Sequence, residues 1–319
     1  MTENFSVTHV RTDDSLFKDY KSLISVKPKD PKWVNFPGWV SFDLLNGDIE
    51  RIKAAKMYED DVILCGFPRS GTSMMQEMIW LIMNDFDFDK AKNIQRGVRA
   101  PIIELYDFYQ SIRNEGSYPQ FDDLQRPRTF KSHMPVQLLP DDVWTKKPKL
   151  IYISRNVKDV AVSFYHFSKD YYNYSYTIDE FLQYFLDDAL ESTPYREHIL
   201  DYLNIPNYKN ILYLTYELVT MNLEFYINEV AAFLGKTISD ENKIKLMEHL
   251  SFKNIKENKG FNNESFLKKI RDDTGATQEI AGHARKGKSG GFKSEMSQEY
   301  IDKFDKWMAE KLETGYNVQ

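Results

Sequence analysis

The stretch of sequence that decides the fold is Val62-Ile-Leu-Cys-Gly-Phe-Pro-Arg-Ser-Gly-Thr-Ser73. The apolar residues 62–67 predict a buried strand, the glycine-containing turn predicts a tight loop, and residues 72–84 have the pattern of a helix. This order aims free backbone N–H groups and the positive end of the helix dipole at one point, which suits an anion. Gly71 would let the backbone approach that anion closely. The side chains that could bind it are Arg69, Ser70, Thr72 and Ser73.

The spacing Gly66-x4-Gly71 is that of a P-loop, but Thr72 stands where the P-loop lysine would be. A P-loop kinase or NTPase also carries an aspartate after a later strand, where it helps to hold Mg2+. Here the apolar run 150–154 is followed by Arg155. This difference favours a second phosphate over a metal ion, so we expect a P-loop-like site for an anionic nucleotide and no metal. A P-loop-type kinase or NTPase is the alternative, which Mg2+-dependent turnover of ATP would identify.

Apolar runs that predict further strands alternate along the chain with helical patterns. Further strands are expected at residues 129–131, 150–154 and 211–215, and further helices at 156–167, 222–234 and 297–312. A capping box of Thr177 and Glu180 predicts the start of another helix, and Gly235 predicts the end of one. Strands that alternate with helices indicate an α/β fold with a central parallel sheet flanked by helices. Since no linker divides the chain, residues 1–319 are expected to form a single domain.

The composition narrows the class of protein. The chain has 319 residues, of which 42% are hydrophobic, and its net charge of −6 argues against a nucleic-acid partner. Cys65 is its single cysteine, which favours a reducing compartment. The first ten residues are polar and contain no apolar core of a signal peptide. No run comes near the ~18 uncharged apolar residues of a membrane span. We therefore expect a cytoplasmic protein without a membrane partner.

Two more segments place positive charge where a phosphate could bind. Arg155 precedes a predicted helix, for which Asn156 is suited as the N-cap. The segment Arg285-Lys-Gly-Lys-Ser-Gly-Gly-Phe-Lys293 combines four basic residues with three glycines, which is typical of a flexible cationic loop. In a chain whose net charge is negative, separate cationic sites favour a ligand with more than one phosphate.

His133 is the histidine whose position suggests a catalytic role. The chain has six histidines, and no pair has the spacing of metal ligands on a helix. His133 follows the short predicted strand 129–131, whose end can face a nucleotide bound at neighbouring strand ends. Neutral imidazole has a pKa near working pH, which suits a general base.

These segments, in this order, resemble the cytosolic sulfotransferases over roughly residues 62–293. That family uses 3′-phosphoadenosine 5′-phosphosulfate (PAPS) as donor, releases adenosine 3′,5′-bisphosphate (PAP), and has one α/β domain with a P-loop-like nucleotide site. The resemblance implies that residues 66–73 bind the 5′-phosphosulfate. It also implies that Arg155 and Ser163 bind the 3′-phosphate, and that a loop closes on this phosphate. The residues of that loop are Arg285, Lys286 and Gly287.

The same resemblance implies how adenine is bound and where the chain departs from its family. Tyr216 and Phe252 match positions that contact adenine, Phe252 by stacking, whereas Met74 replaces an aromatic residue that sandwiches the base. Arg69 replaces the lysine that is common in the phosphosulfate loop, a variant most similar to insect members. The family's short dimer motif is poorly matched at residues 297–302, so a monomer or a weak homodimer is expected.

The catalytic roles also come from the resemblance, because Lys131-Ser-His133 matches the segment that holds the family's catalytic histidine. His133 is expected to take the proton of an acceptor hydroxyl as its oxygen attacks sulfur in a direct in-line transfer without a metal. The leaving phosphate needs charge stabilisation, which Lys131 and Arg69 would supply. Arg69 keeps its proton near neutral pH and would act through its charge alone.

The acceptor is expected to be a small hydrophobic molecule with a hydroxyl group or an amine. Phe167 matches a family position in the acceptor pocket. Residues 27–39 read as an irregular segment rich in proline and tryptophan, and Phe36 and Trp39 are candidates for the pocket wall if residues 1–45 pack near the acceptor. Within the family, a sulfated allylic alcohol could also lose sulfate, which would make the net reaction a dehydration. A non-catalytic nucleotide-binding protein would instead bind tightly without turnover.

Overall fold

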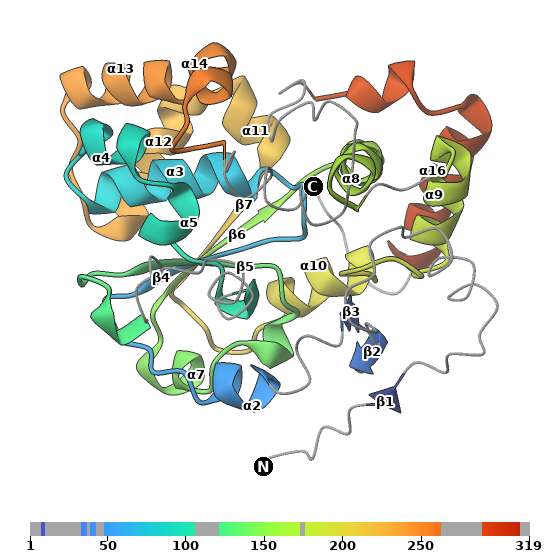
Figure 1. Cartoon of the computed structure of the whole chain (residues 1–319), viewed down its shortest axis with the longest axis horizontal. Coiled ribbons are helices and arrows are strands. Elements are labelled where there is room, and N and C mark those ends of the chain that lie inside the picture. Colours follow the sequence, from blue (N-terminus) through green and yellow to red (C-terminus); the bar gives the residue numbers. More distant parts are fainter. Residues whose placement is uncertain are drawn as a thin grey trace.

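The structure, a computed structural model, describes residues 8–9, 33–36, 39–42, 48–105, 121–172, 176–262 and 289–312. Its centre is a parallel sheet with the strand order β5-β4-β6-β7 (Figure 1). The strands are β4 (Val62–Cys65), β5 (Thr129–Ser132), β6 (Lys149–Ser154) and β7 (Ile211–Thr215). Val62 pairs with Thr129 on one side and with Lys149 on the other, so three strands start level. The predicted α/β fold with a central parallel sheet is confirmed.

Helices cover both faces of this sheet, and the strand residues alternate between them. Val62 and Leu64 pack on the face that is covered by α3 (Thr72–Met83), α12 (Leu223–Leu234) and α13 (Asp240–His249). Ile63 and Cys65 pack on the face that is covered by α2 (Asp48–Lys53), α7 (Asp142–Lys146) and α10 (Tyr195–Leu203). All four residues of β4 are buried, as a parallel strand covered on both faces requires.

A third apolar cluster forms around the loop that follows β4. Phe67 is fully buried in it, together with residues of α8 (Val157–Tyr172), α9 (Ile178–Leu186) and α16 (Gln298–Leu312) (Figure 1). The ring of Phe67 meets that of Phe164 on α8 edge to face, with 6.2 Å between the ring centroids. This packing fixes the loop after β4 against the helix after β6.

Short helices connect these larger elements. They are α4 (Phe88–Asn93), α5 (Arg96–Arg99), η2 (Ile103–Leu105), η3 (Phe121–Asp123), η4 (Val136–Leu138), α11 (Tyr216–Met221), α14 (Phe252–Glu257) and η5 (Gly291–Ser294). Between α5 and η2, Ile102 forms a parallel bridge with Lys131, which places the start of η2 beside β5.

The capping signals of the sequence set several helix ends. Thr177 and Glu180 form the predicted capping box at the start of α9. Asn156 Oδ1 accepts the Lys158 N–H at 3.0 Å, at the start of α8. Gly235, with a φ of 73°, ends α12 as predicted. The predicted strand and helix limits are otherwise close, except that α8 continues to Tyr172 rather than ending at residue 167.

Residues 33–36 and 39–42 differ from the sequence prediction. β2 (Trp33–Phe36) pairs antiparallel with β3 (Trp39–Phe42) and with β1 (Thr8–His9), in a sheet separate from the central one. The prediction of an irregular segment was wrong here, because these strands form by pairing with each other and their local pattern gave no sign of a partner. The side chains of Phe36 and Trp39 lie outside the described part of the chain.

Candidate active site

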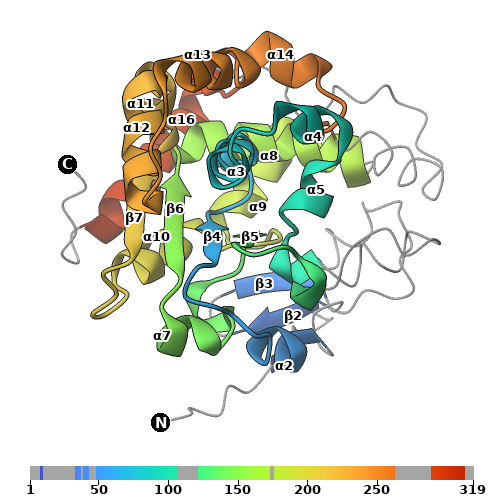
Figure 2. The same ribbon diagram turned by 90° about the vertical axis from the view of Figure 1, so that its left-hand side faces the viewer.

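Loops that follow three parallel strands begin at one edge of the sheet. Cys65 at the end of β4 is level with Ser132 at the end of β5, and the loop after β6 leads into α8. Figure 2 shows α3 and α8 beyond the end of the sheet to which β6 points. Ligands of open α/β sheets bind outside these strand ends. The predicted loop residues, His133 and Arg155 are therefore gathered at the edge where a nucleotide would bind.

The loop between β4 and α3 has a backbone suited to an anion. Arg69 and Gly71 have positive φ angles of 71° and 93°. Gly71 is the N-cap of α3 and makes no side-chain cap hydrogen bond, so the positive end of the helix dipole faces the loop. Ser70 is fully buried, and its Oγ has no hydrogen-bond partner among the described residues. A buried hydroxyl without a partner costs about 1–3 kcal/mol, which a phosphate oxygen would offset.

Tyr216, at the start of α11, lies directly against this loop. A Cβ atom at residue 71 would stand 2.3 Å from Cδ2 of Tyr216, so glycine is required there. Cζ of Arg155 lies 4.5 Å from the centroid of the Tyr216 ring, a cation–π contact. Tyr216 thus joins the predicted phosphosulfate loop to the predicted 3′-phosphate residue.

The side chain of Arg69 extends from the loop to α8. Its Nε donates a hydrogen bond to Ser163 Oγ at 3.1 Å, although 94 positions separate the two residues in sequence. Its Cζ lies 4.9 Å from the centroid of the Phe167 ring. Arg155 Nη1 donates to the carbonyl oxygen of Arg69 at 3.1 Å. The structure therefore brings residues that are predicted to bind PAPS close to Phe167, which is predicted to contact the acceptor molecule.

The hydrogen bonds of His133 define its tautomer. Nδ1 lies 2.5 Å from the carbonyl oxygen of Gly66, and because a carbonyl only accepts, Nδ1 carries the proton. Nε2 is then the basic atom of the neutral ring. Burial holds the pKa of His133 well below its ordinary value, and the charge of Lys131 lowers it further, so the ring is neutral near pH 7.

Two buried ionisable residues were not found from the sequence: Glu104, which contacts His133, and Arg96, whose charge acts on Lys131. Glu104 Oε1 accepts the backbone N–H of His133 at 2.6 Å, and burial raises the pKa of Glu104 to about 7. Burial also lowers the pKa of Lys131, and the charge of Arg96 lowers it further. No spacing in the sequence connects residues 96 or 104 with 133. The bridge between Ile102 and Lys131 brings Glu104 to the strand end, and only the folded chain reveals it.

The predicted adenine contact Phe252 is the first residue of α14, and 40% of its surface is exposed. Ser251 caps this helix, since its Oγ accepts the Asn254 N–H at 3.3 Å. Met74, in the first turn of α3, is partly buried against the same apolar cluster as Tyr216. An exposed aromatic ring on a capped helix is suited to stack on a planar base.

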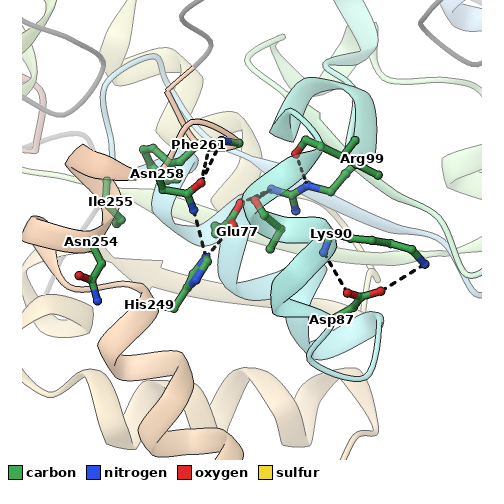
Figure 3. Close-up of polar contacts among 12 residues, drawn as sticks. Glu77, Asp87, Lys90, Arg99, His249, Asn254, Ile255, Asn258 and Phe261 are labelled. Atoms are coloured by element: carbon green, nitrogen blue, oxygen red, sulfur yellow. Dashed lines mark hydrogen bonds and ion pairs between the residues drawn. The ribbon is translucent and has the colours of Figure 1, made fainter.

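A buried ionic network connects α3, the helix that follows the predicted phosphosulfate loop, with the end of α13, which leads to Phe252 in α14 (Figure 3). Glu77 on α3 accepts hydrogen bonds from His249 Nε2 at 2.8 Å and from Arg99 Nη2 at 2.7 Å. His249 is the last residue of α13, and Asn258 Nδ2 lies 3.5 Å from its Nε2. Burial would raise the pKa of Glu77, but its contacts with His249 and Arg99 lower this pKa below its ordinary value. The network therefore contains a carboxylate.

The predicted basic residues Arg285, Lys286 and Gly287 lie outside the described residues. Just downstream, Asp159 on α8 accepts the N–H groups of Gly290 at 2.6 Å and of Phe292 at 3.1 Å. The chain that follows the basic loop is therefore tied to the helix that carries Ser163.

Two other kinds of feature are absent from the described ranges. No group of three or more histidine, cysteine, aspartate or glutamate side chains there could hold a metal ion. None of the helices in the same ranges combines the length and the apolar character that crossing a bilayer requires.

Known proteins similar to this chain agree with one another. The family model described as "Sulfotransferase domain" matches residues 59–315. Luciferin sulfotransferase of Photinus pyralis is 34% identical over 278 residues, which cover 82% of this chain and 74% of that protein. Sulfotransferase 1 family member D1 of Rattus norvegicus is 32% identical over 265 residues, with coverages of 82% and 87%.

Among solved structures, retinol dehydratase in complex with androsterone and inactive cofactor PAP has the same fold. The TM-score is 0.84 at 24% identity, and the alignment covers 100% of this chain and 99% of that one. The family model and the two relatives confirm the sulfotransferase prediction over the kinase or NTPase alternative. Because the family model spans most of the chain and the relatives are collinear with it, this protein belongs to the sulfotransferase family and is a PAPS-dependent sulfotransferase.

Proposed function

We propose that the chain transfers the sulfuryl group of PAPS directly to the hydroxyl or amine of a small hydrophobic acceptor, with His133 as the general base. The observation that carries this proposal is the tautomer of His133. With Nδ1 donating to the Gly66 carbonyl, Nε2 is the ring atom that can accept a proton. The low pKa keeps the ring neutral and ready for that role.

In this reaction Nε2 of His133 accepts the proton of the acceptor hydroxyl. The acceptor oxygen forms its bond to sulfur as the bond between sulfur and the 5′-phosphate oxygen breaks. Lys131 and Arg69 stabilise the negative charge that collects on the leaving phosphate. Burial and Arg96 lower the pKa of Lys131, but an anion beside it would raise this pKa again, so the bound nucleotide would keep Lys131 charged.

The donor site would consist of residues from four segments. The buried hydroxyl of Ser70 and the backbone at Gly71 fit the 5′-phosphosulfate, with Thr72 and Ser73 beside them. Arg155 and Ser163 would bind the 3′-phosphate, over which Arg285, Lys286 and Gly287 close. Adenine would lie near Tyr216, Met74 and Phe252. The contacts of Arg155 with Tyr216 and with the Arg69 carbonyl support this arrangement.

Relatives support a hydrophobic acceptor. One is named for luciferin, and retinol dehydratase forms complexes with androsterone and with retinol. In this chain Phe167 beside Arg69 would supply an apolar wall next to the transfer site, and Phe36 and Trp39 would contribute if residues 1–45 pack there. If the acceptor is an allylic alcohol, loss of sulfate would turn the net reaction into a dehydration, as the name of retinol dehydratase describes for that enzyme.

We also infer that residues 1–319 act as one domain, as a monomer or a weak homodimer, in the cytoplasm. The support is that the family model spans residues 59–315 and that residues 297–302 match the family's dimer motif poorly. Size-exclusion chromatography with light scattering across a range of protein concentrations would measure the assembly. A tight dimer at all concentrations would overturn this inference.

A screen with radiolabelled PAPS tests the function. The acceptors are phenols, steroids, retinoids and amines, and products are separated so that a sulfate ester is distinguished from an alkene plus free sulfate. We expect transfer to at least one class, unaffected by EDTA, and tighter binding of PAP than of AMP by calorimetry. Equal affinities for the two nucleotides, or PAPS binding without transfer to any acceptor, would contradict the proposal.

A further inference from the structure

One face of α10 contacts the loops that carry the site. Tyr195, His198 and Tyr202 are three and four positions apart, so they project from the same side of the helix. All three are almost completely buried, with 1%, 2% and 0% of their surface exposed. Their polar atoms therefore need partners inside the protein.

Each of these side chains donates a hydrogen bond to a backbone carbonyl in a site loop. His198 Nε2 donates to the carbonyl of His133 at 3.1 Å, and Tyr202 Oη donates to that of Met134 at 2.9 Å. Tyr195 Oη donates to the carbonyl of Arg155. The first two carbonyls belong to the loop after β5 and the third belongs to the loop after β6.

The orientation of His198 is fixed by its second ring nitrogen. Because Nε2 donates to a carbonyl, Nδ1 is the acceptor, and it receives the hydroxyl of Tyr152 at 2.8 Å. Tyr152 lies in β6, so the chain of hydrogen bonds runs from the sheet through α10 to the backbone of His133. Burial lowers the pKa of His198 to about 4, which keeps this pattern of donors unchanged near neutral pH.

The same helix face also contacts the loop after β4. The ring of Phe67 lies 4.9 Å from that of Tyr195 and 5.7 Å from that of His198, centroid to centroid, and both pairs meet edge to face. Phe67 lies between Gly66, which accepts from His133 Nδ1, and Arg69. A single helix thus makes contacts with all three loops of the site.

We propose that α10 is the positioning element of the transfer site, with His198 and Tyr202 holding the base His133 and Tyr195 holding the 3′-phosphate residue Arg155. These side chains are positioning residues, since they reach the reaction only through the backbone of other residues. The proposal rests on the proposed roles of His133 and Arg155. If these side chains only needed hydrogen-bond acceptors in the core, any three carbonyls would serve. The three carbonyls that they contact instead belong to residues of the site or to their direct neighbours.

Single-oxygen deletions test the proposal with little change of shape. Tyr202→Phe should lower kcat roughly 10-fold or more, because displacing a catalytic group by less than ~1 Å can cost up to ~10²-fold, while the Kd of PAP stays unchanged. Tyr195→Phe should show the opposite split, with a Kd for PAP raised roughly 10-fold and kcat at saturating PAPS near wild type. His198→Leu should lower kcat, and His198→Gln, which can still donate to the His133 carbonyl, should restore much of it.

Tyr208→Phe is the matched control. Tyr208 is also a buried tyrosine that donates to a carbonyl, that of Pro148 at 2.6 Å, but Pro148 lies before β6 at the opposite end of the sheet. It should lower the melting temperature about as much as the other two tyrosine variants, without changing kcat or the Kd of PAP. If Tyr202→Phe and Tyr195→Phe match Tyr208→Phe in all three measurements, α10 is only structural.

The failure of the proposed function would look different. If the kcat of His133→Ala equals that of wild type, His133 is not the general base, whatever the α10 variants do. If His133→Ala is inactive and Tyr202→Phe retains full kcat, the base stands and the positioning inference fails. The effect of Tyr195→Phe on PAP binding is read without any turnover, so it tests the positioning of Arg155 whichever residue is the general base.

Discussion

His198 and His249 are both buried, with 2% and 6% of their surface exposed, but their partners differ in charge. His198 lies between the hydroxyl of Tyr152 and the carbonyl of His133. His249 contacts the carboxylate of Glu77, which Arg99 also contacts (Figure 3). The first histidine supports the loop where we place the chemistry, and the second supports the chain that leads to the proposed adenine contact.

This difference shows what each half of the site requires. Beside His133, the hydrogen-bond partners of His198 are a hydroxyl and a carbonyl, neither of which carries a charge. In the chain that leads to Phe252, two ion pairs that share Glu77 join α3 to α5 and to α13. Such a pair is hard to break, because removing one partner leaves the others buried and uncompensated. The two halves should therefore respond separately to mutation and to pH.

The largest expected effect is on chemistry alone. His133→Ala should lower kcat by roughly 10²–10⁴-fold, because a positioned base is lost, while PAP affinity and melting temperature remain near wild type. Turnover with one good acceptor, calorimetry and thermal unfolding measure the three quantities. Turnover within a few-fold of wild type would show that another group is the base, and parallel loss of folding would show that His133 is structural.

The next effect is on stability through the ionic network. Glu77→Ala should lower the free energy of unfolding by about 3–5 kcal/mol, because Arg99 and His249 lose their carboxylate while staying buried. Urea denaturation gives the value. Glu77→Gln keeps the shape and a hydrogen-bonding oxygen and should cost less. If both variants lie within about 1 kcal/mol of wild type, the network does not hold these helices.

The pH dependence of stability should separate the two histidine environments. The folded pKa of His198 is about 4, below the ~6.5 of an unfolded chain, so the unfolded state takes up the proton first as pH falls. Stability is then lost between pH ~6.5 and ~4, by about 3 kcal/mol for this group. Burial also lowers the pKa of His133, so this residue likewise reduces the stability as pH falls. Glu77, whose pKa is depressed, loses its contribution only as pH falls below the ordinary carboxyl range.

Comparing the stability of wild type and His198→Gln from pH 7 to 4 isolates this part, since His133 is common to both. The free energy of unfolding should fall less steeply with decreasing pH in the variant, because the contribution of His198 is missing. Equal slopes would mean that His198 is protonated in the folded protein as easily as in the unfolded chain.

The smallest expected effect concerns the recognition of adenine. Phe252→Ala should weaken PAP binding by about 1–3 kcal/mol, the range for one base stacked on an aromatic ring, and leave kcat at saturating PAPS unchanged. Ribose 3,5-bisphosphate, which lacks the base, should bind both proteins equally. Phe225→Ala, at an exposed phenylalanine of α12, is the control and should change neither. If Phe252→Ala weakens both ligands equally, the residue does not act on adenine.

The sheet and its main helices were predictable because their signals are local. β4 and β7 are continuous apolar runs in the sequence, and the capping residues Thr177, Asn156 and Gly235 act within a few positions of the helix ends they set. The loop residues that we expect to bind an anion were predicted directly from the order of strand, turn and helix. These parts depend on neighbours in the sequence, which a pattern can show.

The support of the site was not predictable because it is made by contacts between distant residues. Glu104 reaches His133 only through the pairing of Ile102 with Lys131, and His198 reaches it across 65 positions. The pairing of β2 with β3 is likewise invisible in the local pattern of either strand. A glutamate or a buried histidine has no distinctive spacing, so the sequence alone could not assign these roles.

The close approach of Gly71 to Tyr216 restricts how this sequence can evolve. Any side chain at residue 71 would collide with the tyrosine ring and would need a φ of 93°, which glycine alone adopts without strain. Shrinking Tyr216 would remove the collision but not the backbone strain, and it would also remove the ring beside Arg155. The order of substitutions therefore matters. A change at position 216 first would leave only the backbone strain to oppose a later change at position 71, whereas a change at position 71 first would meet the collision and the strain at once.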